Sequence, residues 1–143
     1  MYNKRMKILR LSEKLTVSSQ LEVKDLDELK QSGVQIIVCN RPDNEDNEQT
    51  PFAKIAAAAA LLNITPINIP FKSDKHTQRD VIAFSKVLQS NKKIHTYCRT
   101  GKRSISLWAA ASVKTEKCTE KVLKSAEELG VDPLKAIAPY LKN

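Results

Sequence analysis

Short apolar segments typical of strands alternate with amphipathic segments along the chain, and this alternation limits the fold more than any other feature. Strands are predicted where β-branched or apolar residues run together, at 7–19, 34–40, 64–70 and 93–97. Helices are predicted between and after them, at 22–33, 51–63, 78–91, 104–114 and 119–130. A short last helix is predicted within 131–143, with Asp132 as its N-cap and Pro133 as its first residue. Strands separated by helices favour an α/β fold, with a mostly parallel central sheet flanked by helices on both faces. Pro66 favours an edge position for the third strand segment, because proline has no N–H to give to a neighbouring strand.

Length and thiol content narrow the class of protein. A length of 143 residues predicts a single domain over residues 1–143, which can bury a full apolar core without disulfides or a structural metal. No apolar run approaches the roughly 18 residues that span a bilayer, and the N-terminus lacks the apolar core of a signal peptide. We therefore expect a cytoplasmic protein that does not bind a membrane. The three cysteines fit no zinc spacing and cannot all pair, so we expect no metal and no cofactor, with Cys39 and Cys118 as small buried residues.

The net charge of +8 predicts a surface that attracts anions. The sequence contains no zinc-finger spacing and no aromatic RNA-binding strand, and only 5% of its residues are aromatic. We therefore expect no nucleic-acid partner. Part of the excess of lysine is explained by a solvated surface, and a small anionic substrate is the next interpretation.

The segment "IHTYCRTGKRS", residues 94–104, places a thiol between a predicted strand and a predicted helix. Ligands of parallel sheets bind at this position. The helix N-terminus and the charges of Arg99, Lys102 and Arg103 favour a thiolate at Cys98. Backbone N–H groups of the turn can hold an anion above the sulfur. Gly101 permits the positive φ and the close ligand approach that such a turn needs.

Arg103 and Ser104, which follow the glycine closely, add to this anion-binding pattern. Arg103 can bind an oxyanion through two parallel hydrogen bonds, which lysine cannot copy. Ser104 can cap the helix that follows and can also hydrogen-bond the sulfur.

This loop resembles the cysteine–arginine anion loops of protein tyrosine and dual-specificity phosphatases and of rhodaneses. From about Ile8 to Trp108 the chain resembles the phosphatase-like domain of the bacterial β-lactamase-hydrolase-like family. The resemblance rests on three motifs in order, "LTVSSQLEVKDLDELKQSGVQIIVCNRPD", "INIPF" and "YCRTGKRSISLWA". It implies a protein-tyrosine-phosphatase-like fold, with Cys98 as nucleophile and Arg103 as catalytic oxyanion binder. It also implies that loop residues bind the substrate: Arg99, Thr100, Gly101, Lys102 and Ser104.

A phosphatase also needs a general acid for the leaving oxygen. Asp74 is the best candidate, because it lies in a loop after a predicted strand, 24 residues before Cys98. Asp43 in "NRPD" is the second candidate, with stabilisation of a turn as its alternative role. Arg41 in the same motif either helps to bind the anion or forms a structural salt bridge. We expect His95, which alternates with core positions of its strand, to be a structural histidine.

Two departures from the phosphatase pattern leave the substrate open. Four residues separate Cys98 from Arg103, as in many rhodanese loops, whereas phosphatases have five. Tyr97 precedes the cysteine where phosphatases usually have histidine. The leading hypothesis is a cysteine-dependent phosphatase that acts on a small anionic substrate or a phosphoprotein. The alternative is a sulfurtransferase that forms a persulfide on Cys98 and passes the sulfur to an acceptor thiol. The third hypothesis is an inactive module that binds an anion or a partner.

Overall fold

The computed structural model describes residues 7–115 and 117–141. In this part of the chain the strands are β1 (Leu9–Ser12), β2 (Leu15–Ser18), β3 (Ile36–Cys39), β4 (Thr65–Asn68) and β5 (Ile94–Tyr97). They form one sheet in the order β1-β2-β5-β3-β4. β1 runs antiparallel to β2, and the other neighbours are parallel. The predicted α/β fold with a mostly parallel sheet is confirmed.

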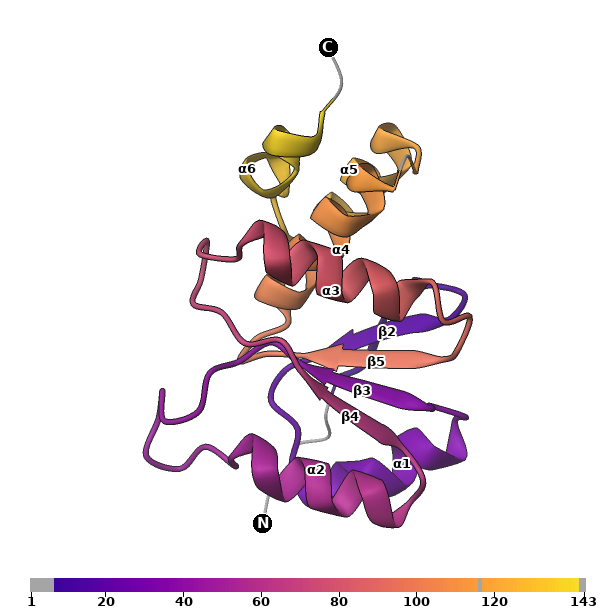
Figure 1. The fold of residues 1–143 in the computed structure, drawn as a ribbon, viewed down its shortest axis with the longest axis vertical. Coiled ribbons are helices and arrows are strands. Elements are labelled where there is room, and N and C mark those ends of the chain that lie inside the picture. The colour runs from indigo at the N-terminus through magenta and orange to yellow at the C-terminus, as the bar shows by residue number, and fades with distance from the viewer. Residues whose placement is uncertain (1–6, 116, 142–143) are drawn as a thin grey trace.

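Helices cover both faces of the sheet (Figure 1). The longer ones are α2 (Phe52–Leu61), α3 (Gln78–Leu88), α4 (Lys102–Lys114) and α5 (Thr119–Glu128), and the shorter ones are η1 (Val23–Asp25), α1 (Leu26–Gln31), α6 (Leu134–Ile137) and η2 (Ala138–Tyr140). α1 and α2 lie on one face, and α3 and α4 lie on the other, with α5 and α6 packed on α4. None of the helices in the described ranges is long and apolar enough to cross a membrane.

The last helix is short, as the sequence predicts, and begins one residue later than predicted. The sequence predicts Asp132 as N-cap and Pro133 as the first helical residue, whereas Pro133 is the N-cap of α6, which has four residues and is followed directly by η2. Pro139 has no N–H for the α-helical ladder, which explains why the helix does not continue unchanged through this point. The final two residues of the prediction, 142–143, lie outside the described residues.

Two apolar cores fill the space between the sheet and its helices. All four residues of β3 are buried, because successive side chains of a strand point to opposite faces and helices cover both faces here. Val38 packs in the core under α3 and α4, whereas Ile37 and Cys39 pack in the core under α1 and α2. The prediction that Cys118 is buried is wrong: Cys118 is exposed, as the N-cap residue of α5.

The parallel register brings the carboxyl ends of four strands to one edge of the sheet. β5 pairs with β2 on one side and with β3 on the other, and β4 pairs with β3. The segments 40–51, 69–77 and 98–101 leave the sheet at this edge, where α4 also begins (Figure 1). Pro66 lies on β4, the edge strand, as the sequence predicts.

His95 is a structural histidine, as expected from its place in the strand. Its side chain is fully buried in the sheet between two hydroxyl groups of β2. Its Nδ1 lies 2.8 Å from the Thr16 Oγ1, and its Nε2 lies 2.7 Å from the Ser18 Oγ. Burial disfavours the charged ring and lowers the pKa of His95 to about 3.

Protonation of His95 makes the free energy of unfolding depend on pH. Its folded pKa lies below its unfolded value of about 6.5, so stability is greatest above pH 6.5 and falls as the pH decreases toward the folded value. The slope approaches about 1.4 kcal/mol per pH unit in this window. We expect His95→Gln, which keeps hydrogen-bonding groups but does not titrate, to flatten urea-unfolding free energies measured between pH 7 and pH 4. The matched change at half-buried His76, His76→Gln, should leave most of the slope. A slope equal to that of the wild type in His95→Gln would contradict this account.

Candidate active site

The turn after β5 holds a buried thiol against the start of α4. Cys98 is fully buried, and the Gly101 N–H donates a hydrogen bond to its Sγ over 3.0 Å. Gly101 is the N-cap of α4 and has a φ of 96°, so it supplies the left-handed backbone that the sequence predicts at this turn. The prediction that Ser104 caps the helix is wrong, because α4 already begins at Lys102.

The backbone around Cys98 offers several N–H groups to a ligand. The N–H groups of Arg99, Thr100, Lys102 and Arg103 have no hydrogen-bond acceptor among the described residues. The first turn of any α-helix leaves such donors free, and the helix dipole adds partial positive charge at the same place. The sequence-predicted loop residues therefore form a turn with the chemistry of an anion nest beside the thiol. Direct contact between these residues and a substrate stays a prediction.

Asn40 links the end of β3 to the segments on both sides of it. Its side chain is fully buried. Its Oδ1 accepts hydrogen bonds from the Thr96 Oγ1 over 2.7 Å and the Ser104 Oγ over 2.8 Å. Its Nδ2 donates to the Ile69 carbonyl over 3.0 Å. One amide thereby positions β5, the first turn of α4 and the chain after β4 relative to one another. The Ser104 hydroxyl is thus engaged with Asn40, and its predicted contact with substrate stays a prediction.

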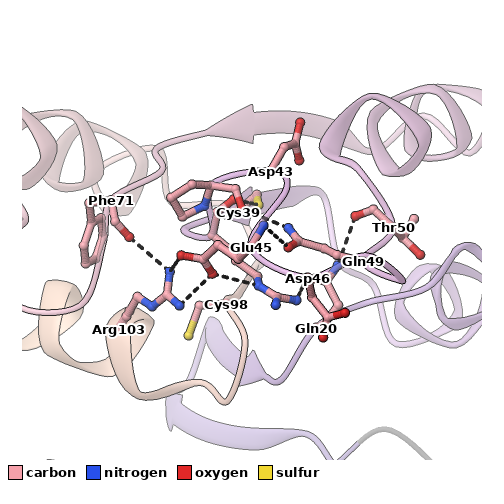
Figure 2. A network of polar contacts seen from close by, with 12 residues as sticks. Gln20, Cys39, Asp43, Glu45, Asp46, Gln49, Thr50, Phe71, Cys98 and Arg103 are labelled. Carbon is pink, nitrogen blue, oxygen red and sulfur yellow. Dashed lines mark hydrogen bonds and ion pairs between the residues drawn. The ribbon is translucent and has the colours of Figure 1, made fainter.

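Glu45 joins the two arginines of the site, Arg41 and Arg103. Figure 2 shows its contact with Arg103. Its Oε1 accepts from the Arg103 Nη2 over 2.8 Å and from the Arg41 Nε over 3.0 Å. Its Oε2 accepts from the Arg103 Nη1 over 3.1 Å. The hydrogen bonds from Arg103 and then from Arg41 lower the pKa of Glu45, against the opposing effect of desolvation. Glu45 is therefore held as a carboxylate between two guanidinium groups.

The contacts of Arg103 leave one edge of its guanidinium free. Nη1 also donates to the Phe71 carbonyl over 3.2 Å, so three of the five N–H donors are in use. The remaining donors are the Nε–H and one hydrogen on Nη2, which point in the same direction from a planar group. This edge can form two parallel hydrogen bonds to an oxyanion.

Arg41 and Asp43 make structural contacts in the loop after β3. Arg41 is 4% exposed and also donates from Nη1 to the Gln20 Oε1 over 3.0 Å. Its ion pair with Glu45 is the structural salt bridge that the sequence left as one alternative. The Asp43 Oδ1 accepts from the Phe52 N–H over 2.9 Å at the first residue of α2. This contact fits the turn-stabilising role, and substrate binding by either residue stays a prediction.

Asp74 lies at a cavity that Arg103 also lines. The cavity has a volume of about 520 Å³ and includes Lys102 in its wall, whereas Cys98 is not part of its lining. Asp74 is exposed in the loop after β4 and has a φ of 60°. The structure thus brings the predicted acid and the predicted oxyanion binder to one space. Its role as a general acid stays a prediction.

Sequence reasoning missed Glu45 and Asn40. The only local signal for Glu45 was its spacing of four residues from Arg41, and nothing in the sequence pointed to Arg103, 58 residues away. Asn40 was visible as a polar residue directly after a buried strand, which is the place where parallel sheets bind ligands.

Replacing Glu45 with glutamine should reduce stability at neutral pH, because two guanidinium groups lose their charged partner. We expect Glu45→Gln to lower the free energy of unfolding by about 1–3 kcal/mol at pH 7. The folded pKa of Glu45 is below its ordinary value, so the stabilisation is present above that value and is lost as the pH falls through the folded pKa. The difference from the wild type should therefore shrink below about pH 4.

Chemical unfolding at pH 7, 5 and 3 checks this expectation. Glu48→Gln, a change of the same type at an exposed position in the same loop, serves as the control and should have little effect at any pH. If the free energy of unfolding of Glu45→Gln stays below that of the wild type by the same amount down to pH 3, the ion pairs of Glu45 are not the source of the stability that the variant loses.

Comparisons with known proteins place this chain among phosphatase-like domains. A family model described as "Beta-lactamase hydrolase-like protein, phosphatase-like domain" matches residues 7–115. The Beta-lactamase hydrolase-like protein of Agrobacterium fabrum is 28% identical over 104 residues, which cover 72% of this chain and 24% of the relative. The one from Xylella fastidiosa strain Temecula1 is 26% identical over 109 residues, which cover 76% and 25%. The chain thus spans about a quarter of the length of these relatives.

Solved structures with the same fold are phosphatases of the protein tyrosine phosphatase type. A crystal structure described as a candidate phosphatase from Neisseria meningitidis is 28% identical, with a TM-score of 0.78 over 93% of this chain and 95% of that chain. PTPMT1 has a TM-score of 0.74 at 10% identity, over 94% and 91% of the two chains. Kinase associated phosphatase, crystallised with its catalytic-site cysteine replaced by serine, has a TM-score of 0.71 at 15% identity, over 95% and 91%.

The predicted protein-tyrosine-phosphatase-like fold is confirmed by these likenesses. The family match runs from the residues before β1 to the end of α4, so it includes the whole sheet and the turn from Cys98 to Arg103. The chain therefore belongs to the family of the β-lactamase hydrolase-like protein, phosphatase-like domain.

Proposed function

We propose that this protein is a cysteine-dependent phosphatase that hydrolyses phosphate monoesters through a cysteinyl-phosphate on Cys98. The observation that supports this most strongly is the turn after β5. In it, the Cys98 Sγ accepts a hydrogen bond from the Gly101 N–H, and neighbouring N–H groups have no protein acceptor. These donors and the N-terminus of α4 favour an anion bound beside the sulfur.

A phosphate monoester has three non-bridging oxygens that suit this arrangement. The free N–H groups of the turn can donate hydrogen bonds to these oxygens, and the free Nε–Nη2 edge of Arg103 can donate to two of them. Glu45 contacts the adjacent Nη1–Nη2 edge of the same guanidinium and so fixes its plane before substrate arrives. Preorganised donors of this kind stabilise the charge of a transition state without further rearrangement.

Transfer to the thiolate forms one bond and breaks another. The Cys98 Sγ donates its electron pair to phosphorus while the bond between phosphorus and the ester oxygen breaks. The leaving oxygen takes the electron pair of that bond together with a proton from Asp74. Water then attacks the cysteinyl-phosphate, gives a proton to the Asp74 carboxylate and releases inorganic phosphate and the Cys98 thiolate. The cycle balances without a redox step.

Sulfur transfer is the second candidate function, and the length of the loop is the observation that favours it. Only four residues separate Cys98 from Arg103, which makes a smaller anion cradle. In this reaction the Cys98 thiolate attacks the outer sulfur of thiosulfate, the S–S bond breaks, and sulfite leaves with the electron pair. The resulting persulfide passes its outer sulfur to an acceptor thiol or, in an assay, to cyanide.

Two assays run side by side distinguish these functions. We expect the wild type to release phosphate from p-nitrophenyl phosphate and Cys98→Ser to lose this activity by at least about a thousandfold, because serine is a far weaker nucleophile in this setting. Cys118→Ser, at an exposed cysteine outside the site, is the matched control and should keep the rate. Formation of thiocyanate from thiosulfate and cyanide, without release of phosphate, would replace this function by sulfur transfer.

The role of Asp74 can be tested by comparing leaving groups. We expect Asp74→Asn to lower kcat for phenyl phosphate by about a hundredfold or more, the ordinary effect of losing a general acid. The loss should be smaller for p-nitrophenyl phosphate, because its leaving oxygen needs less protonation. Asp27→Asn, at an exposed aspartate of α1, is the control and should leave both rates unchanged. An equal loss for the two esters would remove Asp74 from the proton transfer.

A further inference from the structure

The cavity beside Arg103 is bounded by three separate parts of the chain. One wall is the loop after β4, which contributes Phe71 and Asp74. The second wall is the first turn of α4, which contributes Lys102 and Arg103. The third wall is the segment 130–140, which includes α6 and η2 and lies beyond the outer side of α3 and α4 (Figure 1). Its volume of about 520 Å³ lies in the range of small-molecule sites.

The cavity is lined by the two residues that the proposed reaction places around the leaving oxygen, Arg103 and Asp74, whereas Cys98 is not part of its lining. In the proposed reaction Arg103 binds the phosphoryl oxygens and Asp74 protonates the ester oxygen. The group attached to that oxygen therefore extends into the space that both residues line.

The third wall comes from a part of the chain outside the family match, which ends at residue 115. This wall is fixed by packing, because Ile137 is fully buried, Val131 is 7% exposed, and both belong to the apolar cluster that also contains the buried residues of α4. Tyr140 is partly buried against the same core. A rigid wall that the family match does not include can give this chain a substrate preference of its own.

The side chains of the cavity combine aromatic surface with positive charge. Phe71 from the loop after β4 and Tyr140 from the segment 130–140 both contribute aromatic surface to the lining. Lys102 and Lys135 are exposed, and neither forms an ion pair with another residue in the described ranges. The carboxylate of Asp132 already accepts a hydrogen bond from the Leu134 N–H at the start of α6. The cavity thus offers two unpaired cations to a ligand that has already placed its phosphate at Arg103.

We propose that this cavity is the leaving-group pocket and that it selects small aromatic phosphate monoesters that carry a second anionic group. Lys135 is the specificity-determining residue for that second anion, and Lys102 lines the same cavity from the first turn of α4. The proposal rests on the proposed function, because it assigns the cavity to the substrate of the same site.

A pair of substrates that differ in charge but hardly in shape tests the proposal. 3-Carboxyphenyl phosphate and 3-carbamoylphenyl phosphate have similar rings and leaving oxygens, and only the first carries a second anion. We expect the wild type to prefer the carboxylate ester by about two- to fivefold in kcat/KM at low salt. The preference should decrease in about 0.5 M salt, because salt at this concentration strongly screens the attraction between exposed charges. Lys135→Gln should remove most of this preference, and Lys135→Glu should reverse it. Lys124→Gln and Lys124→Glu, at an exposed lysine of α5, are the matched controls and should leave the ratio unchanged.

The outcomes separate this proposal from the proposed function. If both esters are hydrolysed with dependence on Cys98 but at a ratio near one, or at a ratio that Lys135→Glu does not change, the pocket assignment is wrong and the phosphatase stands. If neither ester is hydrolysed, the phosphatase and the pocket assignment fall together. A phosphotyrosine peptide with a higher kcat/KM than the carboxylate ester, insensitive to Lys135→Glu, would show a macromolecular substrate. Thermal unfolding of each Lys135 variant, expected within a few degrees of the wild type, shows that the ratios report on folded protein.

Discussion

The buried amide of Asn40 is the interaction on which the geometry of the site depends. It satisfies hydroxyl groups of β5 and α4 and a backbone carbonyl after β4, all inside the protein where unpaired polar groups are costly. No apolar side chain of similar size could replace it, because Thr96, Ser104 and the Ile69 carbonyl would each lose a partner. The turn that contains Cys98 lies between Thr96 and Ser104. The position of the thiol relative to the loop after β4 is therefore set by one residue at the end of β3.

Glu45 plays a corresponding part for the charges. Arg41 is almost completely buried and needs an anionic partner, and Arg103 must keep one edge free for an oxyanion. By accepting hydrogen bonds from both, Glu45 stabilises the buried arginine and orients the other one. The carboxylate offsets one of the two positive charges, so a net positive charge remains beside the nest of N–H groups. In the proposed function, an anionic substrate would meet donors that are already in place, an arrangement that stabilises the charge of a transition state.

The sequence was sufficient for those features that depend on local pattern. Apolar runs and helical spacing predicted the parallel sheet, and the cysteine and glycine after β5 predicted the turn, with its left-handed Gly101, between that strand and α4. Features that depend on distant contacts were not predictable in the same way. Glu45 contacts Arg103 across 58 residues, and the spacing of charges within one loop does not reveal which partner it meets. The start of α4 was placed at Ser104 because serine is a common N-cap, whereas the left-handed Gly101 ends the turn three residues earlier. The cavity wall from the C-terminal segment was also missed, because short helices after Gly130 carry no motif.

The central claim is that Cys98 carries the phosphoryl group during turnover. It is tested most directly by mixing the protein with an aryl phosphate, denaturing it within milliseconds to seconds, and measuring the masses of the peptides that contain Cys98 and Cys118. The account predicts a phosphoryl adduct on the Cys98 peptide that appears before steady state, and none on the Cys118 peptide. The adduct should persist longer in Asp74→Asn, because its hydrolysis uses that carboxylate. An unmodified Cys98 peptide during active phosphate release, or a persulfide after thiosulfate with no phosphoryl adduct from the ester, would contradict it.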